Sequence, residues 1–460
     1  EPALVDLNVI TFSGKDGHAA EVLVVDKVRS EGSIVVNGLD LNSITLTGDQ
    51  DCNIVALQMA DGSTGIDSQF QNVAIQDSIN WGKATSSSLL KLIGTNPLTF
   101  KGLEVKNSGN YTVTEQFEGS FHSILSVGAL GAPTTHSLSQ ITLSNVVTTH
   151  SLLQLTDDQT TDTKDSLLLL TDSAFLQAVV QKQSMVFLSN MRHVLLQNVM
   201  ADQFCGSFLV VNPAKPRLET LTLSDCTLNG GRMGNQVDGL ITGKISKILM
   251  HSNTITKNTI NYCGFDSADI SMQASVFRAE LSDAIIPQVK SFGNLVEDNT
   301  RFYQGSFLYC IQCNFSDQGS IFSRNHATDF GGVIYASNSA QLDLKDASFI
   351  NNLAEKGGSL VNAMNESTFA ATKLTATGNG QLQDLETETQ AKPDKSMFST
   401  SVAGVIEEFL PAGRVDQVKV ILNPLSEETT EYLNKVQTVK SEMTPHHFFG
   451  FDPSDLAFTS

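Results

Sequence analysis

Short apolar segments separated by Asn, Asp, Ser and Gly recur along the chain at a nearly constant interval. Between residues 296 and 380 these segments end at Asn299, Asn325, Asn352 and Asn379, which are 26, 27 and 27 residues apart (325 − 299, 352 − 325 and 379 − 352). Within each interval the segments alternate apolar and polar positions, and none sustains the 3.6-residue apolar stripe of a helix. A fixed period of this length indicates a repeat architecture.

Two or three short strands and their turns, within about 26 residues, form one coil of a parallel β-solenoid. Because stacked coils lie about 4.8 Å apart, the same position of successive coils forms a column. An Asn at each corner can then bond its amide to the next one, as in cross-β stacks. We therefore predict an all-β, single-stranded right-handed parallel β-helix with a structural ladder through Asn299, Asn325, Asn352 and Asn379.

One repeat has a more specific pattern, Phe322-x-x-Asn325-x-Ala327-x-x-x-Gly331-Gly332, and a shortened copy begins at residue 349. This pattern resembles the F-x-x-N…G-G-A-I repeat of the polymorphic outer-membrane protein family, whose members are surface adhesins with a right-handed β-helix. The resemblance covers residues 291–380. It implies the fold, and it implies no individual functional residue.

The same interval can be followed towards the start of the chain. A series of Asn and Asp residues closes short strands at 26 to 30 residue intervals, with longer intervals that indicate insertions near 126–137 and 261–291; its members are Asp49, Asp77, Asn107, Asn145, Asp172, Asn198, Asp225 and Asn253. We therefore expect the β-helix to occupy residues 1–380. Residues 381–396 are polar and acidic and indicate a loop or linker, and residues 381–460 are expected to form a C-terminal cap or assembly region with one short helix at 426–441.

Composition narrows the choice of partners. The 460 residues include 49 acidic and 29 basic side chains, a formal net charge of −20. This charge disfavours nucleic acid, whose phosphates need a basic patch, and anionic lipid. Colloidal solubility is the favoured interpretation, and binding of cations or of a basic partner is the less favoured one. The chain has no apolar run of 18 residues, so we expect no membrane-spanning helix.

Cysteines and sequons favour a secreted protein. The six cysteines are an even number, as expected of disulfides in an oxidising compartment. Cys263 and Cys310 lie ten and eleven residues after Asn253 and Asn299, so stacking of those coils would bring the two cysteines within disulfide reach. The C-x-x-C at Cys310 has no second ligand pair, which makes a redox or zinc site the less favoured interpretation.

Three N-x-Ser/Thr sequons, at Asn110, Asn314 and Asn365, are candidate glycosylation sites. The chain begins with Glu1 instead of Met, which suggests a processed protein. Together these features predict an extracellular or cell-surface glycoprotein.

One acidic segment is a candidate metal site. Asp158, Asp162 and Asp165 offer three oxygen ligands to calcium, but their spacing differs from that of an EF-hand. We therefore interpret this segment as a solvated corner of a coil and expect no cofactor. A calcium site is the alternative interpretation.

The sequence contains no Ser/His/Asp, P-loop or dinucleotide-binding signature. The consecutive signatures of polygalacturonase-type enzymes are also missing. We therefore expect a non-enzymatic extracellular structural or adhesive protein, such as a subunit of a surface filament or coat, with itself or other surface proteins and glycans as partners. The alternative is a polysaccharide-active enzyme, a lyase or a glycoside hydrolase, on one face of the solenoid.

Overall fold

The computed structural model describes the fold over most of the first 380 residues and in short segments beyond them. The described residues are 4–13, 21–28, 33–46, 53–59, 66–80, 87–109, 120–129, 135–157, 166–212, 218–233, 239–260, 275–280, 285–354, 358–364, 367–372, 375–377, 379–381, 398–402, 405–408, 415–416 and 419–421. Every regular element among them is a strand. The chain forms two compact units, unit 1 with residues 1–227 and 243–245, and unit 2 with residues 228–242 and 246–460.

Unit 1 is built from strands that alternate between two parallel sheets. One sheet contains β1 (Leu4–Ser13), β3 (Ser33–Asn42), β6 (Ile66–Gln76), β9 (Thr95–Lys106), β11 (Thr135–Ser144), β13 (Leu167–Leu176), β15 (His193–Asp202) and β17 (Leu218–Ser224). The other contains β2 (Glu21–Val28), β5 (Asn53–Met59), β8 (Ser88–Ile93), β10 (Phe121–Ala129), β12 (Val147–Asp157), β14 (Val179–Ser189) and β16 (Cys205–Val211). Short strands β4 (Thr45–Leu46) and β7 (Ile79–Asn80) pair between them.

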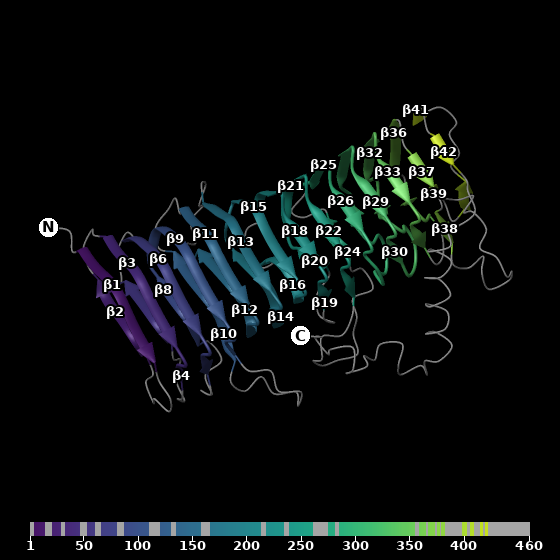
Figure 1. Cartoon of the computed structure of the whole chain (residues 1–460). Coiled ribbons are helices and arrows are strands. Elements are labelled where there is room, and N and C mark those ends of the chain that lie inside the picture. The colour runs from purple at the N-terminus through teal and green to yellow at the C-terminus, as the bar shows by residue number, and fades with distance from the viewer. Residues whose placement is uncertain are drawn as a thin grey trace, which may run out of the picture. The chain divides into compact units, whose positions relative to one another are not determined.

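Each strand of unit 1 pairs in parallel with the equivalent strand one turn of the chain later, which defines a solenoid (Figure 1). In one row, Phe100 lies beside Leu138 and Leu138 beside Leu170. Aromatic residues stack inside the coils in the same way, and the rings of Phe70 and Phe100 are 5.1 Å apart and nearly parallel. The core is therefore a set of columns in which each buried side chain packs on its equivalents above and below.

The long strands bend at one residue that the sequence supplies for the purpose. In β13 the alternation of burial places Leu168, Leu170 and Phe175 in the core. Between them Asp172 has a left-handed backbone, with φ of 49°. Asn198, its in-register neighbour in β15, has φ of 53°. Asn and Asp adopt this conformation at little cost, so the strand turns a corner without losing its ladder of hydrogen bonds.

Unit 2 has shorter strands arranged on three faces. The first face contains β18 (Thr227–Asn229), β21 (Ile245–His251), β22 (Thr254–Thr256), β25 (Gln288–Phe292), β26 (Leu295–Glu297), β28 (Asn314–Gln318), β29 (Ile321–Ser323), β32 (Gln341–Lys345), β33 (Ser348–Ile350), β36 (Thr368–Thr372), β37 (Thr375–Thr377), β41 (Val415–Asp416) and β42 (Lys419–Ile421). The second contains β20 (Gly239–Thr242), β24 (Ser275–Glu280), β27 (Leu308–Ile311), β31 (Ile334–Ser337), β35 (Val361–Met364), β39 (Phe398–Val402) and β40 (Val405–Glu408). The third has β30 (His326–Ala327), β34 (Leu353–Ala354) and β38 (Gly380–Gln381), and β19 (Arg232–Met233) pairs with β23 (Thr259–Ile260).

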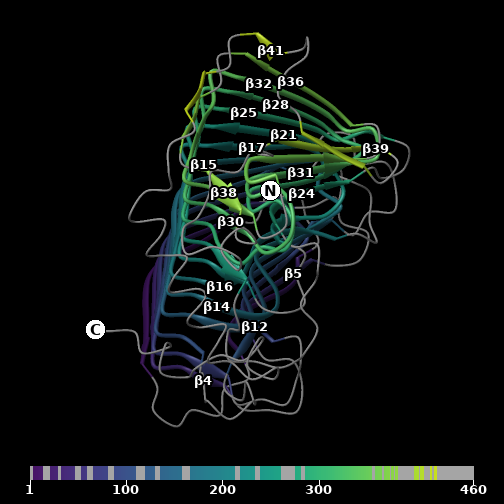
Figure 2. The same cartoon turned by 90° about the vertical axis from the view of Figure 1, so that its right-hand side faces the viewer.

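Figure 2 shows β25, β28, β32 and β36 along one face of these coils, β24 and β31 on a second, and β30 and β38 on a third. The pairings between described strands are parallel, except that β39 and β40 form an antiparallel hairpin. Phe322 and Phe349 stack in the core with ring centroids 4.8 Å apart. Strands β41 and β42 add a further coil next to β36 and β37, so parallel pairing extends past the expected boundary at residue 380.

The parallel β-solenoid predicted from the repeat is confirmed. The insertion expected at 261–291 agrees with the longer interval of 41 residues between Asn258 and Asn299, the stacked corner residues on either side of it. The longer coil expected between Asn107 and Asn145 agrees with the stacking of these two corner residues at an interval of 38 residues. Within the range 126–137, residues 126–129 belong to β10 and residues 135–137 to β11, and residues 130–134 lie outside the described residues. The short helix expected at 426–441 lies outside the described residues.

The early corner series mixes two columns, because the coils whose corners are described each have two left-handed corners a few residues apart, such as Asp172 and Gln177. Asp77, Asn107 and Asn145 belong to one column. The backbone N–H of each donates to the backbone carbonyl of the residue that precedes the corresponding corner of the next coil. Asp172 and Asn198 belong to the other column. The predicted series switches from one column to the other between Asn145 and Asp172, so the nearly constant spacing at that point is a coincidence.

The same error affects the start of the long ladder. Asn253 stacks on Asn294, and Asn258 is the residue that stacks on Asn299. The prediction that Asn253 shares a column with Asn299 is therefore wrong.

Candidate functional site

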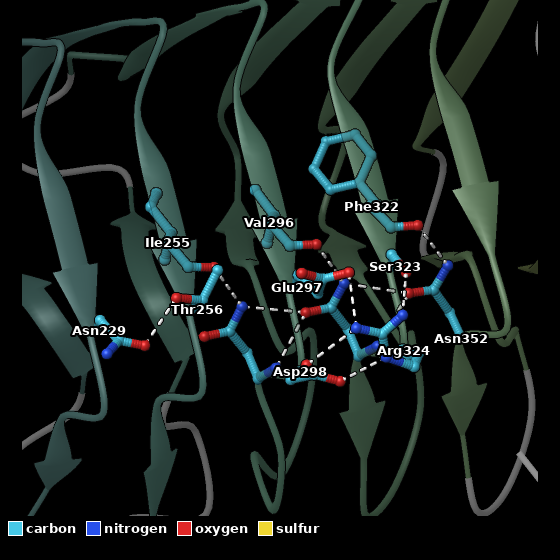
Figure 3. Close-up of polar contacts among 12 residues, drawn as sticks. Asn229, Ile255, Thr256, Val296, Glu297, Asp298, Phe322, Ser323, Arg324 and Asn352 are labelled. Atoms are coloured by element: carbon cyan, nitrogen blue, oxygen red, sulfur yellow. Dashed lines mark hydrogen bonds and ion pairs between the residues drawn. The ribbon is translucent and has the colours of Figure 1, made fainter. Parts of the chain in front are cut away.

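The best-defined polar feature of unit 2 is a column of buried asparagines at one corner of the coils (Figure 3). Asn258, Asn299, Asn325, Asn352 and Asn379 are each at most 2% exposed. The side-chain Nδ2 of each donates to the Oδ1 of the next, at 2.9, 3.0, 3.0 and 3.0 Å. The predicted ladder through the last four is confirmed, and Asn258 extends it by one coil.

Each amide in this column also bonds to the backbone. Asn325 is typical: its Nδ2 donates a second hydrogen bond to the carbonyl of Val296, at 2.9 Å, and its backbone N–H donates to Asn352 Oδ1, at 3.0 Å. Its own Oδ1 accepts from both the backbone N–H and the Nδ2 of Asn299. Both donors and the acceptor of the amide are therefore satisfied in the core. Asp would lack the donors, so the position requires Asn.

An ion-pair cluster covers the outside of the same corner. Arg324, which precedes Asn325, donates to both carboxylate oxygens of Asp298, at 2.8 and 3.1 Å, and its Nη2 lies 2.7 Å from Glu297 Oε1 (Figure 3). All three side chains are about one-third exposed. Solvent screening limits such pairs to about 0–1 kcal/mol each. The buried amides, not the ions, are therefore the main polar link between coils.

A second, shorter network lies at the neighbouring corner. Asn253 donates through Nδ2 to Asn294 Oδ1, at 2.9 Å, and the backbone N–H of Asn294 donates to Ser320 Oγ, at 3.0 Å. Ser320 Oγ in turn donates to the buried carboxyl of Asp317, at 2.5 Å. Burial raises the pKa of Asp317, while hydrogen bonds from Ser291 and Ser320 oppose the rise.

In unit 1 the equivalent contacts between corner residues are exposed. Asn145 Nδ2 donates to Asn107 Oδ1, at 2.9 Å, and Asn198 Nδ2 donates to Asp172 Oδ1, at 2.7 Å. Water competes for these groups, so the contacts contribute less than the buried ladder of unit 2.

A histidine in the core of unit 1 contrasts with these satisfied amides. His136 is fully buried in β11, in register between Leu98 and Leu168. Among the described residues neither ring nitrogen has a hydrogen-bond partner. Burial lowers the pKa of His136 to about 4, so the ring is neutral at pH 7.

A second histidine with a lowered pKa lies in β12. His150 stacks on His122, with ring centroids 4.4 Å apart, and meets the edge of Phe187. Burial, and then the charges of His122 and Lys182, lower the pKa of His150 to about 4.

His136 and Asp317 are not among the site residues predicted from the sequence, although the alternation of inward and outward positions marks both. His136 has the inward parity of Leu138 in β11, and Asp317 has the inward parity of Phe315 in β28. A titratable residue at an inward position of a strand is the signal that would have found them.

The cysteines pair differently from the prediction. Cys310 forms a disulfide with Cys313, and the Cα atoms are 5.5 Å apart. The expected bridge between Cys263 and Cys310 is therefore wrong, since it depends on the incorrect stacking of Asn253 on Asn299; Cys263 itself lies outside the described residues. Cys205 is also disulfide-bonded.

Cys226 is the described cysteine that keeps a thiol. Its Sγ lies 3.4 Å from the backbone oxygens of Leu196 and Ser224. Burial raises the pKa of this thiol to about 11, so it is not a reactive thiolate.

Of the remaining predicted site residues, one sequon lies in a described strand. The calcium candidates Asp158, Asp162 and Asp165 and the sequons at Asn110 and Asn365 lie outside the described residues. The third sequon is at the start of β28, where Asn314 is partly exposed and pairs in register with Gln288 and Gln341.

Among the described residues no group of three or more His, Cys, Asp or Glu side chains is arranged to hold a metal ion. No helix in this part of the chain is long and apolar enough to cross a membrane. No protein-family model, curated protein or solved structure significantly matches the chain.

Proposed function

We propose that this chain is a non-enzymatic extracellular protein with a structural and adhesive role, such as a subunit of a surface filament or coat. The observation that supports this most is the asparagine ladder. Its buried amides bond to one another and to the backbone, so they stabilise a regular stack of coils and leave the outer strand faces free to present side chains. The resemblance to the polymorphic outer-membrane protein repeats points in the same direction.

The arrangement of carboxylates also favours a non-enzymatic role. A glycoside hydrolase needs two carboxyl groups facing one another across the scissile bond, about 5 to 9.5 Å apart. In the described residues the surface carboxylates of Glu297 and Asp298 are both paired with Arg324, and Glu280 is paired with Arg278. The oxygens of these carboxylates are therefore engaged by guanidinium groups instead of facing one another across a groove.

Disulfide bonding supports an extracellular location. Cys310 and Cys313 are bridged and Cys205 is disulfide-bonded, and such bonds persist in oxidising compartments. Partly exposed Asn314 would accept a glycan in the same environment.

The proposal is tested by imaging and by an assay for cleavage. Full-length protein is concentrated in steps and examined by negative-stain electron microscopy and sedimentation velocity, and it is incubated with polygalacturonate, xylan and dextran while new reducing ends are measured. We expect ordered assemblies and no new reducing ends. Dispersed monomers at every concentration would contradict the structural role, and the release of reducing ends would support the alternative, a polysaccharide-active enzyme.

A further inference from the structure

One surface of unit 2 differs in charge from the rest of this acidic chain. Residues 246–260 and 285–296 include Lys247, His251, Lys257 and Lys290 and no Asp or Glu, whereas the whole chain has a net charge of −20. These two segments contain most of β21, all of β22 and β25, and the first two residues of β26, whose last residue is Glu297. On the first face of the coils β21 pairs with β25, and β22 pairs with β26. The surface is therefore locally basic.

The register places several of these side chains together. In β25 Gln288, Lys290 and Phe292 point outwards and are exposed, while Val289 and Ser291 point inwards. Lys247 pairs in register with Gln288, and His251 pairs with Phe292. We call the outward group Lys247, His251, Gln288, Lys290 and Phe292 the basic face. Neighbouring strands are about 4.8 Å apart, and alternate residues of a strand about 6.6 Å, so the two lysines are about 8 Å apart along the sheet.

The basic face has an exposed aromatic pair. The rings of His251 and Phe292 are stacked with centroids 5.4 Å apart and an angle of 3°, and Phe292 is 48% exposed. Ile321, which is 44% exposed, lies nearby and pairs in register with Leu295. A stacked ring pair in solvent beside lysines therefore offers a ligand an apolar platform next to cationic groups.

The adjoining corner leaves room for a ligand. Gly293 follows Phe292, and an added Cβ at Gly293 or at its neighbour Gly319 would have no atom within 4 Å. The described surface next to the aromatic pair is therefore open. Gln318, the exposed in-register neighbour of Phe292, adds a further hydrogen-bonding amide.

We propose that the basic face binds a linear acidic polysaccharide, one that bears carboxylates or sulfates along the chain. The ammonium groups of Lys247 and Lys290 pair with the acidic groups, and the amide of Gln288 bonds to hydroxyls. The rings of His251 and Phe292 receive the C–H surface of a sugar, whose weakly positive hydrogens favour the electron-rich ring face. The inference rests on the adhesive part of the proposed function, and it names the chemical class of the partner.

Charge density favours such a polysaccharide over nucleic acid. Duplex DNA has a negative charge about every 1.7 Å along its axis and needs many basic contacts. The basic face provides two lysines, and acidic Glu297 and Asp298 lie directly beyond it. A polymer with widely spaced charges and apolar sugar faces fits that composition better.

The test is a binding titration of the full chain by biolayer interferometry. The probes are polygalacturonate for carboxylates, dextran sulfate for sulfates, unsubstituted dextran as the neutral polymer, and a DNA duplex. The variants are the double change Lys247→Ala/Lys290→Ala and the single change Phe292→Ala. Lys345→Ala is the matched control, because Lys345 is exposed on the same row as Phe292 two coils further on, beside Asp343 on its own strand.

We expect wild type to bind one or both acidic polymers and not dextran, with affinity that falls as salt is added. The double change and Phe292→Ala each weaken binding at least tenfold, and Lys345→Ala changes it less than twofold. The proposal is overturned if neither acidic polymer binds, if Lys345→Ala weakens binding as much as the double change, or if DNA binds as tightly as the polysaccharide.

The outcome is separable from that of the proposed function. If the protein assembles but binds no acidic polysaccharide, the proposed ligand is contradicted and the proposed structural role is not. New reducing ends in the bound polysaccharide would keep the ligand and contradict the non-enzymatic role.

Discussion

Acid should destabilise unit 1 through His136, and the size of the effect follows from its burial. The imidazole is fully buried between leucines and has a pKa of about 4, compared with 6.5 for an accessible histidine. The unfolded chain therefore binds a proton at His136 below pH 6.5, whereas the folded chain binds it only below about pH 4. Stability is fully present above pH 6.5, falls through the interval from 6.5 to 4, and levels off below it. The depression of about 2.5 units corresponds to about 3 kcal/mol over the whole interval.

The replacement His136→Leu tests this reasoning, because leucine occupies the in-register positions on both sides. Urea unfolding followed by circular dichroism at pH 7.5 and pH 4.5 gives the change in unfolding free energy for both proteins. We expect wild type to lose about 2.5 kcal/mol more than His136→Leu between these values, since other groups titrate equally in the two. At pH 7.5 the variant should be more stable, because two unbonded buried nitrogens are removed. Equal pH dependence of the two proteins would refute the account of His136.

Three further predictions concern unit 2 and are checked by urea unfolding. Asn325→Ala removes the Oδ1 that accepts from the backbone N–H and the Nδ2 of Asn299, and it should lower the unfolding free energy by about 3–5 kcal/mol. Arg324→Ala, at the partly exposed residue before it, should lower it by about 1 kcal/mol or less. Equal losses for the two variants would contradict the ladder. Asp317→Asn should gain stability over wild type as the pH rises from 4 to 7, because the raised pKa of Asp317 makes ionisation costly in the fold; no gain would contradict a buried carboxyl. Cys310→Ser/Cys313→Ser should cost only about 2 kcal/mol, because the bridge spans three residues; unfolding of the variant in buffer would contradict this.

The fold and the long ladder could be predicted because one residue type repeats at a fixed interval. Asn325, Asn352 and Asn379 are spaced at intervals of 27 residues. Because the coils stack, residues separated by one coil length occupy the same position in successive coils. Asn258 was not recognisable in this way, because the interval to Asn299 is 41 residues. An insertion destroys the period while the stacking persists.

Register was the weak point of prediction from sequence elsewhere. Two corners lie close together in the coils whose corners are described, and Asn, Asp, Ser, Gln and Gly are all tolerated at them, so spacing alone did not identify the column. The disulfide prediction depended on that register and was wrong with it. Cys310 instead bonds to Cys313, three residues later in the same corner, and the Cα separation of 5.5 Å lies in the normal range for a disulfide.

The basic face could not be predicted from spacing either. Lys247 and Lys290 are 43 residues apart (290 − 247), and only the register of β21 with β25 brings them together. A count of charges in the paired segments would have indicated it, but only after the pairing was known.

The stacking of coils is the claim on which the ladder, the buried networks and the basic face all depend. It is tested most directly by placing spin labels at Gln318→Cys and Lys345→Cys, two exposed positions that are 27 residues apart in sequence (345 − 318) and paired in register on adjacent strands. Adjacent parallel strands put these backbones about 4.8 Å apart, so the electron paramagnetic resonance spectrum should show strong dipolar broadening. A spectrum equal to the sum of the two singly labelled proteins would contradict the stacked-coil structure.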